Sequence, residues 1–119
     1  MTFEQIAILQ AVAAESKRIG WSYCKCACVI AHAAESLEIL KPESYPRLFT
    51  EGMENAPEIT ALYDELISLI RETDLLHGQG NLGDDENPPA DPLFTECALS
   101  ENGTEFLAEL VRDSEMRRS

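Results

Sequence analysis

The chain has 119 residues, of which 45% are hydrophobic and 26% are charged, as in an ordinary globular domain. This length allows one hydrophobic core but is too short for two domains. The 22 acidic residues outnumber the nine basic ones and give a net charge of −13, which repels a phosphate backbone. Because the basic residues are also scattered along the chain, direct binding to nucleic acid is disfavoured.

The N-terminus predicts no secretion signal. Residues 1–5 have neither the basic start nor the apolar run of a signal peptide, and no stretch approaches the ~18 apolar residues of a membrane span. We therefore expect a cytoplasmic protein. Its 4 cysteines are then expected to be reduced thiols rather than a disulfide framework.

The first part of the chain predicts two long helices. Thr2 and Gln5 form a capping-box pattern, and apolar residues at helical spacing predict a helix over residues 3–19. A second helix is expected to be capped by Ser22 and to end before Pro42. This second helix is rich in alanine and cysteine. Because such small side chains allow close approach of a neighbouring backbone, we expect it at the centre of the fold.

The middle of the chain predicts a short helix, a long helix and a loop. The short helix is expected over about residues 44–52. Pro57 suits the first turn of the strongest helix, which is expected to continue to Leu76 and to stop at Gly78. The segment 78–92 is rich in Gly, Asn, Asp and Pro, and it predicts a mobile acidic loop.

The last part predicts a strand and a final helix. Alternating residues from Leu93 to Leu99 indicate a strand, and Ser100 is expected to cap the helix that precedes a frayed tail over residues 113–119. The sequence therefore predicts one mainly α domain over residues 1–112. It has four to five helices and a short strand or β-wing near the C-terminus.

The order of these last elements resembles that of a winged-helix domain. A long helix, a glycine, a loop and a short strand are followed by LSENGTEFL at residues 99–107, which matches the Leu-Ser/Thr-x-x-Gly-x-x-x-Leu pattern of such domains. The resemblance covers about residues 57–111. It implies a winged-helix-like fold in which the long helix is the recognition helix and the loop is the wing.

A recognition helix that reads DNA should carry Arg, Lys, Asn or Gln on its outer face. The long helix and the loop carry carboxylates instead, and a dense negative surface of this kind can imitate nucleic acid and attract a basic protein. The candidate partner-binding residues are Glu58, Asp64, Glu65, Glu72, Asp74, Asp84, Asp85, Glu86 and Asp91.

A second resemblance, over about residues 25–66, is to the Panacea antitoxin domain. The helix over residues 31–40, the LFTE turn at 48–51 and the helical sequence at 57–63 are similar to that family's helix, Leu-Phe turn and Pro-x-x-x-x-Leu-Tyr helix. The family's aromatic-Gly-Pro segment is replaced here by ENAP at 54–57. The resemblance implies an antitoxin-like function.

Three residues of the second predicted helix have the spacing of potential zinc ligands. Cys24, Cys28 and His32 lie at i, i+4 and i+8, and Cys97 is a conceivable fourth ligand. Three ligands along about 12 Å of one straight helix do not easily reach a single ion. The favoured interpretation is therefore that the cysteines are small packing side chains, and no cofactor is expected.

Four aromatic residues lie near the expected turns between helices. They belong either to the core, which we favour, or to an exposed anchor for a partner. They are Trp21, Tyr23, Tyr45 and Phe49.

We find no catalytic motif in the sequence. GQGNLG at residues 78–83 spells a dinucleotide-binding pattern, but it follows a helix instead of beginning one. The sequence therefore predicts a non-enzymatic acidic protein that binds and inhibits a basic or nucleic-acid-binding protein. An antitoxin or an inhibitor from a phage or mobile element would act in this way.

Two other functions remain open. In the first, the chain is a winged-helix transcription regulator that binds DNA as a homodimer through Lys17, Arg18, Lys25 and Arg47. In the second, it is a metal-dependent or thiol enzyme that uses the cysteines and the histidine of the candidate zinc site.

Overall fold

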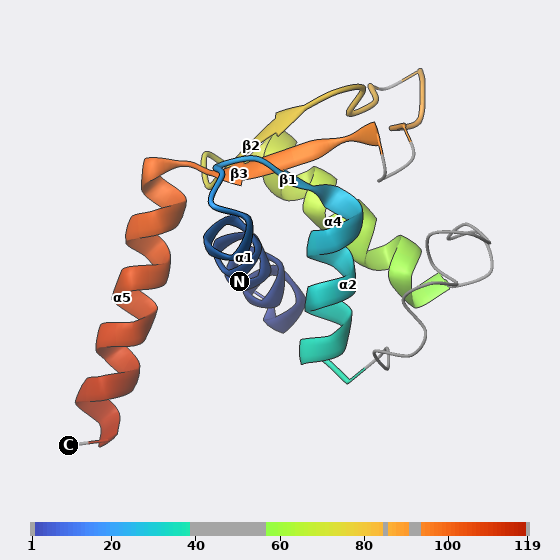
Figure 1. The fold of residues 1–119 in the computed structure, drawn as a ribbon. Coiled ribbons are helices and arrows are strands. Elements are labelled where there is room, and N and C mark those ends of the chain that lie inside the picture. The colour runs from blue at the N-terminus through green and yellow to red at the C-terminus, as the bar shows by residue number, and fades with distance from the viewer. Residues whose placement is uncertain (1, 39–56, 85, 91–93, 119) are drawn as a thin grey trace.

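The structure is a computed structural model that describes residues 2–38, 57–84, 86–90 and 94–118 (Figure 1). The elements in this part of the chain are α1 (Phe3–Ile19), β1 (Cys24–Lys25), α2 (Cys26–Ser36), α4 (Pro57–Glu72), β2 (Leu76–Gln79), β3 (Glu96–Leu99) and α5 (Glu101–Arg118). The predicted mainly helical fold is confirmed, and a small three-stranded antiparallel sheet accompanies the helices. The short helix predicted over 44–52 lies outside the described residues.

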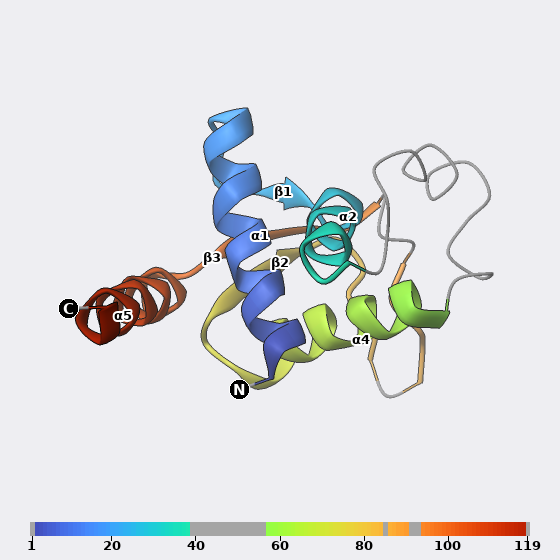
Figure 2. The ribbon, with the colours of Figure 1, turned by 90° about the horizontal axis from the view of Figure 1, so that it is seen from below.

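The hydrophobic core lies where α1, α2 and α4 meet one another and the sheet (Figure 2). Helix α2, which was predicted to be central, contacts α1, α4 and β1, whereas α1 contacts α2, α4, α5, β1 and β3. The central position therefore belongs to α1, because it packs against both of the other core helices, the sheet and the last helix. The largest fully buried side chains of the three helices are Ile8, Leu9, Val12, Val29, Ile30, Ile59, Leu62, Leu66 and Leu69.

The first helix has the predicted bounds because both of its ends are encoded locally. The Thr2 hydroxyl accepts a hydrogen bond from the Gln5 backbone N–H at 3.2 Å, and the Gln5 side chain accepts one from the Thr2 N–H at 3.1 Å. At the other end Gly20 has a φ of 70°, and its N–H donates to the Ser16 carbonyl at 2.9 Å. The predicted capping box is thus confirmed.

The second helix differs from its prediction at both ends. Ser22 does not cap it, because the chain first forms β1, in which Cys24 pairs with Cys97 of β3. The helix begins only at Cys26. It ends at Ser36 rather than near residue 40, since Glu38 has a φ of 61°, a left-handed conformation that a helix cannot contain.

The region after α4 is also more ordered than predicted. The helix ends at Glu72, and residues 76–79 form β2, which pairs with β3. The helix was expected to stop at Gly78 and the loop to begin there, and both predictions are wrong. Residues 76–79 belong to the sheet instead. The sheet order is β1-β3-β2, so β3 is the central strand.

The last helix continues through residues 113–118, which were predicted to be a frayed tail. Neither glycine nor proline occurs after Gly103, so the sequence contains no residue that stops the helix. In the described part of the chain, the helices are either too short or too polar to cross a membrane.

Trp21 is not part of the core, contrary to the favoured prediction. Its side chain is 69% exposed, whereas Tyr23 is half-buried. The cause is local: the Ser16 hydroxyl donates to the Trp21 carbonyl at 2.6 Å and holds the backbone beside α1, while the side chain faces outward. The other two aromatic residues of that prediction, Tyr45 and Phe49, lie outside the described residues.

Candidate functional site

The outer side of α4 forms an acidic stripe. The helix turns Leu62, Leu66 and its other apolar side chains into the core. Beside this apolar side, Glu58, Glu65 and Glu72 recur every seven residues and therefore form a stripe along its border, where Glu58 and Glu65 line a hollow together with Leu62. Glu58 and Glu72 are exposed and Glu65 is half-buried, so the negative charge of this stripe faces solvent.

Two further predicted residues extend this charged surface. Asp64 is exposed on α4, and Asp74 is exposed just beyond the end of the helix. The Asp74 carboxylate accepts a hydrogen bond from the Asn102 side chain at 2.7 Å, which fixes it beside the start of α5. From here on, the acidic face means residues Glu4, Glu58, Asp64, Glu65, Glu72 and Asp74.

Glu4 joins the acidic face from α1 and was not predicted. A hollow of about 310 Å³ lies between the beginning of α1 and α4, and its walls include Glu4, Glu58 and Glu65 above Ala61 and Leu62. Its apolar floor and carboxylate rim suit the aliphatic stem and charged head of a lysine or arginine side chain. No local signal marks Glu4, because its place depends on how α1 packs beside α4.

The packing of α1 against α4 is fixed by a hydrogen bond within this face. The Gln5 side chain donates to Glu65 at 3.1 Å, in addition to its role in the capping box. The same residue therefore caps α1 and orients a carboxylate of α4. This bond makes the acidic face a joint surface of two helices rather than of one.

The acidic loop is shaped by one of its own carboxylates. Asp84 accepts hydrogen bonds from the backbone N–H groups of Glu86 at 2.8 Å and Asn87 at 2.7 Å. These bonds, with a smaller contribution from the nearby charge of Arg71, lower the pKa of Asp84 below its ordinary value. Glu86 is exposed, whereas Asp85 and Asp91 of the predicted set lie outside the described residues.

The loop is also attached to α4. The Tyr63 hydroxyl donates to the Ala90 carbonyl at 2.5 Å and lies 3.2 Å from the Thr95 hydroxyl. Because Tyr63 points from the buried side of α4, it holds the end of the loop against that helix. Through Tyr63, the helix that carries the carboxylates of α4 is thus bonded to the loop that carries Asp84 and Glu86.

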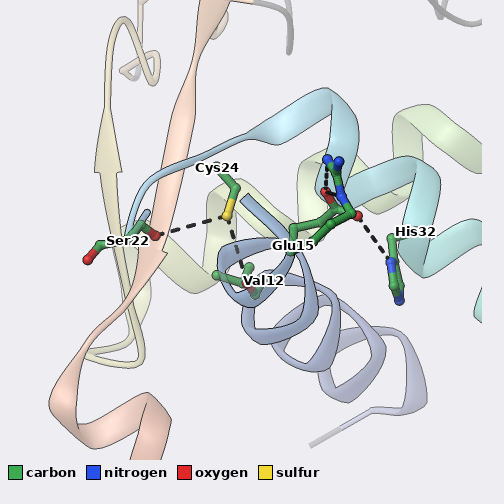
Figure 3. A network of polar contacts seen from close by, with 6 residues as sticks. Val12, Glu15, Ser22, Cys24 and His32 are labelled. Carbon is green, nitrogen blue, oxygen red and sulfur yellow. Dashed lines mark hydrogen bonds and ion pairs between the residues drawn. The ribbon is translucent and has the colours of Figure 1, made fainter. Parts of the chain in front are cut away.

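The candidate zinc ligands do not form the predicted helical face. Cys24 lies on β1, where its thiol approaches the Val12 carbonyl at 3.8 Å, whereas Cys28 and His32 lie on α2 (Figure 3). Among the residues that the structure describes, no group of three His, Cys, Asp or Glu side chains could hold a metal ion. The three candidate ligands do not share one helical face because β1 replaces the first turn of the expected helix.

The cysteines pack as small side chains. Cys24, Cys26 and Cys97 are buried and Cys28 is half-buried, all as free thiols. Burial raises the pKa of Cys24 to about 11 and also raises the pKa of Cys28. A hydrogen bond between Cys26 and Cys97 lowers the pKa of the former and raises that of the latter. Cys24, Cys28 and Cys97 therefore hold their protons more tightly than free cysteines do, which disfavours a nucleophilic role for them.

His32 belongs to a polar network centred on Glu15 (Figure 3). Glu15 is only 8% exposed, yet its carboxylate contacts the Arg18 guanidinium at 2.6 Å and His32 Nδ1 at 3.3 Å. The network joins α1 to α2 and satisfies a carboxylate that would otherwise be buried without a partner. This role accounts for His32 without metal binding.

The described cations of the alternative DNA-binding surface do not lie on α4, the helix that would read DNA. Lys17 and Arg18 are exposed at the end of α1, and Lys25 is exposed on β1, while Arg47 lies outside the described residues. Arg18 is also held by Glu15.

No known protein family, curated protein or solved structure matches the chain.

Proposed function

We propose that this chain is a winged-helix-like domain that binds and inhibits a basic or nucleic-acid-binding protein through its acidic face. The observation that carries the proposal is the stripe of Glu58, Glu65 and Glu72 on the exposed side of α4. In a winged-helix domain this helix would read DNA, and it would then need donors and cations on that side. Here its outer side carries the charge of the nucleic acid itself.

The order of elements supports the fold assigned in this proposal. The long helix α4 is followed by β2, the acidic loop, β3 and α5, in the order recognition helix, wing and closing helix that the sequence pattern predicts. The pairing of β2 with β3 makes the loop the tip of a hairpin. The loop therefore stands where a wing would stand.

The geometry of the stripe supports the choice of a basic partner. Residues seven apart on a helix are separated by about 10 Å along its axis, which is the rise of about three nucleotides of one DNA strand. The net charge of −13 would also accelerate encounter with a basic surface. A groove that normally holds nucleic acid would thus be blocked, in the manner of an antitoxin or of an inhibitor from a phage or mobile element.

The proposal is tested by neutralising the acidic face and comparing what the protein retains from a lysate of its native host. The variant Glu58→Gln/Glu72→Gln, which neutralises the two exposed residues of the stripe, should lose basic proteins that the wild type retains at low salt and releases at high salt. A matched variant, Glu38→Gln/Glu101→Gln, removes two exposed carboxylates outside the acidic face and should retain them.

Two results would contradict the proposal. One is retention of the same proteins by both variants, because the acidic face would then be irrelevant to binding. The other is salt-dependent binding of the wild type to random duplex DNA, which would favour the DNA-binding regulator instead.

A further inference from the structure

The last helix is incompletely covered by the rest of the described chain. α5 runs along the outside of the molecule, apart from α2 and α4, and contacts α1 and β3 (Figures 1 and 2). Phe106 and Leu107 pack partly against the core, but Val111 is 58% exposed. A helix of this length is marginal in water by itself and gains its stability from packing of an apolar side. Another surface is therefore expected to cover α5.

The uncovered side of α5 is a stripe of small and apolar residues. Thr104, Ala108 and Val111 lie at i, i+4 and i+7 on this side, and Leu107, which packs partly against the core, lies at its border. At its beginning this stripe opens into a hollow of about 470 Å³ between α5 and the end of α1. The hollow has a mixed lining, in which Leu99 and the exposed Trp21 are apolar and Lys17, Thr104 and two serines are polar.

We propose that this surface binds a second copy of the chain, with the two α5 helices packed antiparallel about a two-fold axis. Charge complementarity selects this occupant and this direction. Glu105 and Arg112 are exposed beside the stripe and lie seven residues apart, on either side of its middle. In an antiparallel pair, Glu105 of each copy faces Arg112 of the other, whereas a parallel pair places like charges together.

The other charges near this surface have both signs, since Glu109 lines a groove on α5 together with Glu105 and Arg112. The chain as a whole repels its own copies through its net charge of −13, but the hollow is bordered by Lys17. An antiparallel α5 would place its C-terminal half over the hollow, beside Trp21.

Helices α4 and α5 lie on different sides of α1 (Figure 2), and the member of the acidic face that lies beside α5 is Asp74, through its bond with Asn102. The stripe of Glu58, Glu65 and Glu72 on α4 therefore stays exposed in both copies, so this inference is independent of the proposed function.

Sedimentation equilibrium of the purified chain tests the proposal. The wild type is expected at twice the chain mass of 13.2 kDa at micromolar concentrations. Val111→Glu should weaken self-association by about 100-fold or more, because it places a carboxylate in an apolar contact. Phe3→Glu, which adds the same charge at another exposed apolar residue, should leave the dimer unchanged.

A charge exchange tests the direction of the helices. Glu105→Arg and Arg112→Glu should each weaken the dimer, by about tenfold, and the double variant should restore it because both ion pairs re-form in reverse. Trp21 is the chain's one tryptophan, so its fluorescence should shift to the blue on association. The proposal is overturned if the wild type remains monomeric throughout a concentration series that spans about 100-fold and reaches about millimolar concentration. It is also overturned if Val111→Glu leaves the dimer intact or if the exchanged pair fails to restore it.

Discussion

Cys24 carries the clearest pH dependence among the individual residues. Its pKa of about 11 lies above the ordinary value of 9.0 because folding buries the thiol. Between these two values the folded chain keeps a proton that the unfolded chain releases, so this contribution to stability is complete below pH 9 and is lost as the pH rises towards 11. Cys28 and Cys97 add shifts of the same direction.

We therefore predict that the free energy of unfolding, measured by urea denaturation, falls between pH 9 and 11. Cys24→Ala removes the titrating group, so its stability should fall less steeply over this interval. Tyrosine and lysine titrate in the same range in both proteins, and the comparison cancels their contribution. Equal slopes for the two proteins would show that burial of Cys24 does not govern this loss.

Single residues also show where reasoning from sequence ends. Glu58 and Glu72 of α4 are exposed, as expected, because a regular series of leucines and isoleucines turns another side of the helix into the core. Glu4 was missed, since its place in the acidic face depends on contact between α1 and α4. Trp21 was misjudged for a related reason: an aromatic residue beside a turn can face either way, and only the path of the chain decides.

Among the elements, α5 is attached to the body through a close contact at its first turn. The Ser100 hydroxyl donates to the Asp74 carbonyl and accepts from the Gly103 N–H at 3.0 Å, while the Ser100 N–H donates to the Leu75 carbonyl at 3.1 Å. A Cβ atom added to Gly103 would lie 2.2 Å from the Leu75 oxygen. Only glycine therefore allows α5 to begin so close to the turn before β2.

We predict that Gly103→Ala lowers the free energy of unfolding by about 1–3 kcal/mol, although alanine is the better helix former. Glu101→Ala changes an exposed residue in the same turn and should cost less than about 1 kcal/mol. Thermal or urea denaturation followed by circular dichroism measures both. A Gly103→Ala protein as stable as the wild type would mean that α5 begins farther from the turn.

The elements that were predicted correctly are those whose signals are local. The bounds of α1 follow from a capping box at its start and a glycine at its end, all within the helix and its flanking residues. The start of α2 and the end of α4 were wrong because Cys24 and Leu76 pair with β3. A partner strand distant in the sequence leaves no mark on these short segments, so their strands could not be predicted.

For the molecule as a whole, the net charge of −13 means that folding brings many carboxylates together. Salt screens this repulsion more strongly in the compact chain than in the extended one. We predict that raising the ionic strength from about 10 mM to about 150 mM increases the melting temperature, by about 4 °C for each kcal/mol gained. Asp64→Asn/Glu72→Gln should gain less from salt, and a melting temperature that falls with salt would contradict this electrostatic account.

The order of the sheet has a consequence for how the chain acquires its structure during synthesis. β3 lies between β1 and β2, so the segment nearest the N-terminus reaches its partner only when residues 96–99 are available. On the ribosome, α1, α2 and α4 emerge long before that, with the edge of β1 unpaired. The nascent chain therefore assembles its helices first and closes its sheet late, and it remains open to proteases and chaperones until residues 96–99 have been made.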